Sequence, residues 1–97
     1  QRAGFLVASR ASEYESLESS ESTPLWLDSF HSDWFLEEGI WSSVLELARV
    51  RPVIIVSPEL HSRPPESVWR KFRENSIANT LLSICTDRPF EVENYEI

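Results

Sequence analysis

The chain lacks methionine altogether and has only one cysteine and two glycines among its 97 residues. Without an initiator methionine, we expect residues 1–97 to be a single domain cut from a longer protein. The one cysteine, Cys85, can form neither an intramolecular disulfide nor a CxxC zinc site, which favours an intracellular compartment, cytoplasmic or nuclear. Gly4 and Gly39 are too far apart for a phosphate-binding glycine motif, so we expect no nucleotide cofactor.

Long hydrophobic runs are also missing, since the longest apolar cluster covers only residues 53–56. A membrane-spanning helix needs roughly 20 apolar residues, and the N-terminus has no basic-then-apolar layout of a signal peptide. We therefore expect no association with a membrane.

Positive charge is absent from residues 11–48, which contain nine acidic residues and no Lys or Arg. The formal net charge of the whole chain is −7 at pH 7. An acidic domain repels phosphate backbones, so nucleic-acid binding is disfavoured and a basic partner is favoured.

The pattern of apolar residues predicts a small α/β or α+β domain. Its expected sheet has about three strands in the order β-α-α-β-α-β, packed against two to four helices. The predicted strands are residues 3–8, 52–57 and 90–97, and the predicted helices are 24–38, 40–51 and 66–85, the last with a break near 75. Residues 9–23 are rich in Ser and Glu and are predicted to form an acidic loop.

The strand at 52–57 is the clearest of these elements, because V-I-I-V is β-branched throughout and lies between two prolines. The run V-I-I-V-S-P-E-L also resembles a SUMO-interacting motif, a short aliphatic strand that adds to a sheet edge. Arg49 and Arg51 stand where that motif carries acids. A buried central strand is therefore the favoured interpretation.

The segment 23–41 combines aromatic and acidic residues with no basic residue nearby. The aromatic side chains exceed what one face of one amphipathic helix can bury, so a second face is expected to meet another protein or a second copy of the chain. The leading functional hypothesis is thus a non-catalytic protein–protein interaction domain of a regulatory or assembly protein. Its predicted partner-binding residues are Trp26, Phe30, Trp34, Phe35, Trp41, Asp33, Glu37 and Glu38.

Two alternatives stay open. The loop after the strand at 52–57 can contribute Ser57, Glu59, His61 and Arg63 to the ligand cleft of an α/β enzyme. The stretch W-R-K-F-R can instead contact phosphates through Arg70, Lys71 and Arg73.

Catalytic and metal-binding motifs are weak along the whole chain. Cys85 falls at an apolar helical position, where a cysteine usually behaves as a small buried hydrophobic residue. His31 and His61 have no ligand pair at a metal-binding spacing. We predict no metal site and name no catalytic residue.

Overall fold

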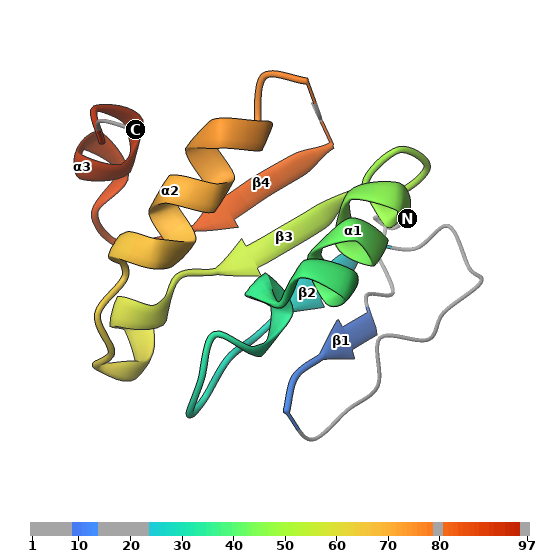
Figure 1. Ribbon diagram of the computed structural model, residues 1–97. Helices are drawn as coiled ribbons and strands as arrows, with labels where there is room; N and C mark the ends of the chain where they lie inside the picture. The colour runs from blue at the N-terminus through green and yellow to red at the C-terminus, as the bar shows by residue number, and fades with distance from the viewer. Residues whose placement is uncertain (1–8, 14–23, 79–80, 96–97) are drawn as a thin grey trace, which may run out of the picture.

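The computed structural model describes residues 9–13, 24–78 and 81–95. Four parallel strands form one sheet, in which the spatial order β1-β2-β3-β4 is the same as the order along the chain (Figure 1). The strands are β1 (Ser9–Ala11), β2 (Leu25–Leu27), β3 (Val53–Val56) and β4 (Leu82–Cys85).

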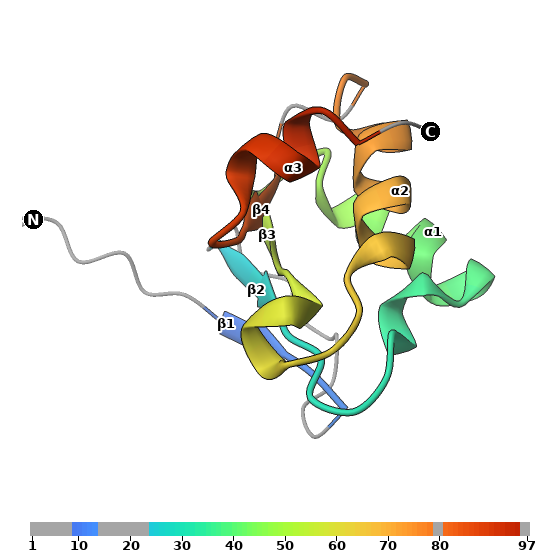
Figure 2. The same cartoon turned by 90° about the vertical axis from the view of Figure 1, so that its left-hand side faces the viewer.

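Three α-helices occur in these residues: α1 (Glu38–Leu47), α2 (Glu66–Asn75) and α3 (Pro89–Glu93). Short 3-10 helices at Trp34–Leu36 and Pro58–His61 precede α1 and α2. Figure 2, which views the sheet from its side, shows α1 and α2 together on one side of the strands.

Alternation along the strands separates two faces of the sheet, because successive side chains point to opposite sides. On the first face, which we call the covered face, side chains from β1 to β4 pack in the core with Val44 of α1 and Val68 of α2. This face consists of Ala11, Leu25, Leu27, Val53, Ile55, Leu82 and Ile84.

The second face, which we call the open face, carries the intervening residues. Parallel register places Arg10, Trp26, Ile54 and Ser83 side by side across all four strands. Val56 and Cys85 form the next row of the same face. Its side chains are half-buried or exposed, whereas those of the covered face on β1, β2 and β3 are buried.

The predicted α/β class is confirmed, with a small sheet packed against helices. The predicted strand at 52–57 is β3, and the helices predicted at 40–51 and from 66 correspond to α1 and α2. Burial of Val53 and Ile55 on β3 agrees with a core strand rather than an exposed motif. The strand predicted at 3–8 lies outside the described residues, as do residues 14–23 of the predicted acidic loop.

Three predicted elements are wrong. The helix expected at 24–38 is replaced by β2, a loop and a 3-10 helix, because Leu25 and Leu27 alternate with Trp26 and are needed between β1 and β3. Residues 9–11 of the expected acidic loop form β1. The helices predicted at 24–38 and 40–51 leave Gly39 outside any helix, but it lies within the first turn of α1.

The C-terminal part also differs from the prediction. Helix α2 ends at Asn75, and the apolar residues that were expected to continue it form β4, whose burial alternates as a strand requires. The strand expected at 90–97 begins as α3, where Pro89 occupies the first turn that tolerates proline. Cys85 is therefore exposed on an outer strand instead of buried in a helix.

Across the described residues, no helix is both long and apolar enough to cross a membrane.

Candidate functional site

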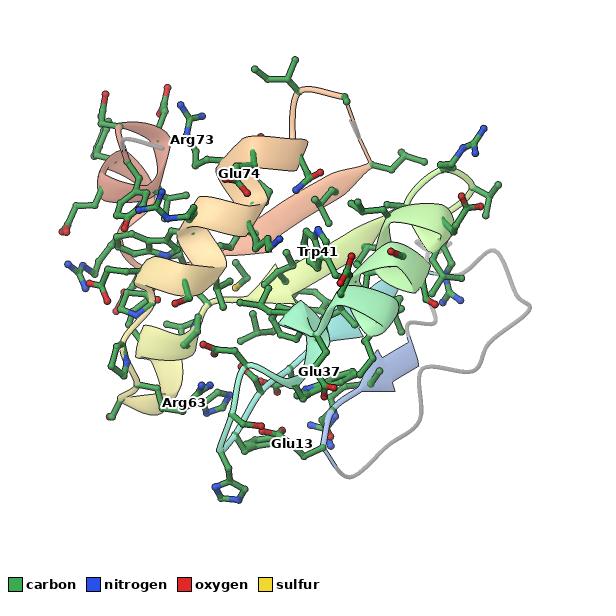
Figure 3. The ribbon with its side chains drawn as sticks, viewed as in Figure 1. Glu13, Glu37, Trp41, Arg63, Arg73 and Glu74 are labelled. Carbon is green, nitrogen blue, oxygen red and sulfur yellow. The ribbon has the colours of Figure 1, made fainter. Side chains whose placement is uncertain are left out.

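The loops that follow the four strands bring polar side chains together at the carboxyl edge of the sheet. Because the strands are parallel, all four of these loops leave the same edge. Figure 3 shows Glu13 and Arg63 at this edge, on the loops after β1 and β3. We call the group the carboxyl-edge cluster; it consists of Glu13, Asp28, Asp33, Ser57, Glu59, His61, Arg63 and Thr86.

Glu13, just after β1, fastens the loop that follows β2. Its carboxylate accepts the backbone N–H groups of Phe30, His31 and Ser32 at 2.9, 2.7 and 2.8 Å. Partial desolvation acts to raise the pKa of Glu13, but these N–H donors outweigh it and lower the pKa to about 2. The carboxylate is therefore charged at neutral pH and keeps the loop in one conformation.

Asp28 and His61 connect the loops after β2 and β3. The His61 Nε2 and Asp28 Oδ1 atoms lie 2.7 Å apart, and the side chains are 28% and 11% exposed. An ionised carboxylate can only accept a hydrogen bond, so Nε2 must carry the proton in this contact. In the neutral ring, Nδ1 then has the lone pair.

The surroundings of this pair restrict its movement. The Asp28 carboxylate also accepts the N–H of Ser29, and the indole of Trp34 donates to the Asp28 carbonyl oxygen at 2.7 Å. The ring of Phe30 lies against His61, with 4.7 Å between the ring centroids. The imidazole is thus oriented by a carboxylate on one side and an aromatic ring on the other.

Arg63 ties the same two loops together a second time. Its guanidinium donates to Asp33 Oδ1 at 2.5 Å and to the hydroxyl of Ser29 at 3.0 Å. Ser62 turns the chain just before it, with a left-handed φ of 61° that is uncommon for a residue other than glycine. Arg63 therefore braces the loops and is already paired with a carboxylate.

Glu59 connects the loops after β3 and β4. It accepts hydrogen bonds from the hydroxyls of Ser57 and Thr86, and Ser57 in turn accepts the indole N–H of Trp69 at 2.9 Å. Desolvation opposes the shift, but the two hydroxyl donors lower the pKa of Glu59. Ser57 is fully buried, so its hydroxyl supports the structure and cannot reach a ligand.

The four cleft residues suggested by the sequence do lie together, with different tasks. Ser57, Glu59 and Arg63 hold the loops together through their side-chain hydrogen bonds. His61 uses its Nε2 atom in the contact with Asp28, and its second ring nitrogen is Nδ1. The sequence did not identify Asp28 as the partner of His61, because 33 positions separate them along the chain. Glu13 had no signal either, as it is one acid among several in the Ser/Glu-rich segment.

The predicted partner-binding aromatics do not form one surface, since the helix that would gather them does not exist. Phe35 and Trp41 are 0% and 5% exposed in the core. Trp26 lies on the open face, Phe30 belongs to the loop after β2, and Trp34 begins the 3-10 helix that follows this loop. Of the acids, Asp33 pairs with Arg63, and Glu37 and Glu38 are exposed at the start of α1.

The residues proposed to contact phosphates lie on α2 and differ in their exposure. Arg70 is exposed, whereas Lys71 and Arg73 are half-buried and the Nε of Arg73 is fully covered. Arg73 borders a pocket of about 210 Å³ between α2, β4 and α3, which is otherwise lined mainly by apolar groups. Figure 3 shows Arg73 near the end of α2 on the side of α3.

No three His, Cys, Asp or Glu side chains are placed to share a metal ion within the part of the chain that the structure describes. The polar groups at the carboxyl edge include His61, whose Nε2 contacts Asp28 and whose imidazole can transfer protons and form hydrogen bonds. No known protein family matches the chain, and neither a curated protein nor a solved structure shows significant similarity to it.

Proposed function

We propose that the carboxyl edge of the sheet is the ligand site of an α/β enzyme, with His61 as its acid–base group. The observation that carries this proposal is the 2.7 Å contact between His61 and Asp28. It occurs where the loops of parallel strands converge, which is the edge at which open α/β sheets bind ligands. Imidazole is the side chain best suited to exchanging protons near neutral pH.

In the proposed mechanism, Asp28 holds the ring by accepting a hydrogen bond from Nε2–H, which leaves Nδ1 free to take a proton from a bound ligand. The carboxylate stabilises the imidazolium that results, as in other carboxylate–histidine pairs. Proton transfer by a positioned side chain typically contributes about 10²–10⁴-fold to a rate. Glu13 and Arg63 are positioning residues, since they hold the loops that carry Asp28 and His61.

The proposal is tested by recording ¹H–¹⁵N spectra of the chain with inorganic phosphate, a monosaccharide and a simple acyl ester as probes. We expect probe-dependent shifts in residues 28–33 and 57–63, and we expect them to disappear in His61→Ala. Ser42→Ala, on the exposed side of α1, is the matched control and keeps the shifts. If every probe leaves the carboxyl edge unchanged, or acts equally on His61→Ala, the proposed site is wrong.

Protein recognition is a second candidate function, and the exposure of one aromatic side chain favours it. Trp26 is 36% exposed on a face of a parallel sheet that no helix covers in the described residues. Tryptophan is among the residues that most often anchor protein interfaces. With only one cysteine in the chain, we place either function in a reducing intracellular compartment.

A further inference from the structure

A pocket of about 210 Å³ lies between α2, β4 and α3. Its apolar lining comes from all three elements and consists of Phe72, Ile84, Pro89 and Val92. Val92 is buried, but Phe72 and Ile84 stay half-buried although both pack against the core. Apolar surface at this end of the covered face therefore borders an open space, which is the setting of many small-molecule sites.

Contacts beside the pocket hold its two helical walls together. The Trp69 ring of α2 meets the ring of Tyr95, just after α3, edge to face with 5.8 Å between the centroids. The guanidinium of Arg88, just before α3, lies 5.0 Å from the same Trp69 ring. The indole N–H of Trp69 is in turn bound to the Ser57 hydroxyl just after β3. The pocket is thus preformed, because one anchored indole joins α2 to both ends of α3.

Arg73 supplies the positive charge of the pocket lining. Its Nε atom is fully covered and has no hydrogen-bond partner among the residues that the structure describes. A covered N–H without an acceptor is uncommon in proteins, and a guanidinium donor is best satisfied by an anion. The residue as a whole is half-buried, so the outer part of its guanidinium stays within reach of a ligand. Figure 3 shows Arg73 on the side of α2 that faces α3.

The other two polar lining residues do not satisfy Arg73. The hydroxyl of Thr86 already donates to Glu59. Glu93 is exposed to water, and within the described part of the chain it forms no ion pair with Arg73. Salt and water screen an exposed charge, so Glu93 reduces the attraction of the pocket for an anion without cancelling it.

The volume and the lining together define the ligand. An apolar cavity of about 150 Å³ holds one benzene molecule, so about 210 Å³ accommodates one ring with a short acid chain. A guanidinium can pair with a carboxylate through two parallel N–H bonds. We propose that the pocket binds a small aromatic monocarboxylate, with its ring against Phe72 and Val92 and its carboxylate on Arg73. This inference goes beyond the proposed function and does not depend on His61.

The test is a titration of the 97-residue chain with 3-phenylpropionate, followed in ¹H–¹⁵N spectra. We expect saturable shifts in residues 72–76 and 84–93. The neutral 3-phenylpropionamide, and acetate, which lacks the ring, should each bind at least about tenfold more weakly. These comparisons use the parent chain and require no variant to fold. Absence of saturable binding overturns the proposal, as does equal affinity for the acid and its amide or for the acid and acetate.

Substitutions on α2 and α3 then locate the carboxylate. Arg73→Met should weaken binding of 3-phenylpropionate by at least about tenfold, and Arg73→Lys by less, because an ammonium keeps the charge but not the fork. Arg70→Met removes the same charge from an exposed position of α2 outside the pocket, and this matched control should bind as the parent does. Glu93→Gln should tighten binding by about twofold, because it removes an exposed like charge.

Two outcomes would assign the acid elsewhere. Equal weakening by Arg70→Met and Arg73→Met would show that only the overall charge of α2 attracts it, which contradicts the proposal. His61→Ala separates the pocket from the carboxyl edge and should leave the affinity for 3-phenylpropionate unchanged. Loss of binding in His61→Ala would place the acid at the carboxyl edge and overturn the pocket site, whereas loss only in the Arg73 variants would support it.

Discussion

The two faces of the sheet differ although they are built from the same strands. On β3, Ile55 is fully buried among side chains of β2 and the helices, while its neighbour Ile54 is half-buried on the open face. The residue type, the strand and the backbone environment are nearly the same, so the difference lies in what covers each side chain. Helices α1 and α2 make one face a core, whereas no helix among the described residues packs on the other face (Figure 2).

The largest expected difference in the free energy of unfolding is between alanine substitutions of these two isoleucines. Ile55→Ala removes a buried side chain, and we expect a loss of about 4 kcal/mol in the free energy of unfolding. Ile54→Ala should cost only about 1 kcal/mol, because water already reaches part of the side chain. Urea denaturation of both variants measures the difference, and equal losses would contradict the description of an open face.

A smaller effect is expected where the covered face meets the carboxyl edge. Trp69→Phe keeps an aromatic ring but removes the indole N–H that donates to the buried Ser57 hydroxyl. We expect a loss of about 1–2 kcal/mol, which urea denaturation measures. Trp26→Phe, a matched change on the open face, should cost less. The reverse order would show that the Ser57 hydrogen bond contributes little.

The carboxyl-edge loops should give an effect of about 1 kcal/mol that depends on pH. Glu13→Gln removes the charge that accepts three backbone N–H groups. The folded pKa of Glu13 is depressed to about 2, so its stabilisation is present in full above its ordinary value of 4.5 and is lost as pH falls toward 2.

Thermal unfolding of the parent chain and of Glu13→Gln, followed from neutral pH down to pH 2, measures this dependence. The two curves should differ at neutral pH and converge in acid. A constant difference across this range would mean that the Glu13 charge is not what holds the loop.

The smallest effect is expected for substitution of an exposed residue on the open face. Ser83→Val on the open face should change the free energy of unfolding by less than about 0.5 kcal/mol, because Ser83 is exposed. Its higher strand propensity should favour the folded state slightly. Urea denaturation of the parent chain and of Ser83→Val measures this change, and a large loss would show that Ser83 makes a contact that an exposed position does not provide.

Prediction from sequence succeeded where local pattern and environment agree. The central strand is apolar on both sides, so V-I-I-V indicated β3 without further information. It failed at β2 and β4, because three or four residues with alternating apolar side chains also fit one turn of a helix. Their partners on neighbouring strands, distant in the chain, decided between the two.

The candidate site was likewise predictable from the sequence only in part. The loop after β3 was identifiable because a polar stretch rich in proline follows a buried strand. Asp28 was not identifiable as the partner of His61, because it had been assigned to a helix and only the parallel pairing of β2 with β3 places the two loops side by side.

The amino-acid sequence by itself determined the α/β class, the central strand, the helices α1 and α2 and the excess of negative charge. These follow from composition and from short-range periodicity, which act within one or two turns of chain. Only the tertiary structure decided which aromatics are core, which face of the sheet the helices α1 and α2 cover and which acid contacts His61. The physical reason is that parallel pairing joins segments far apart in the chain, and their contacts are made only when the sheet forms.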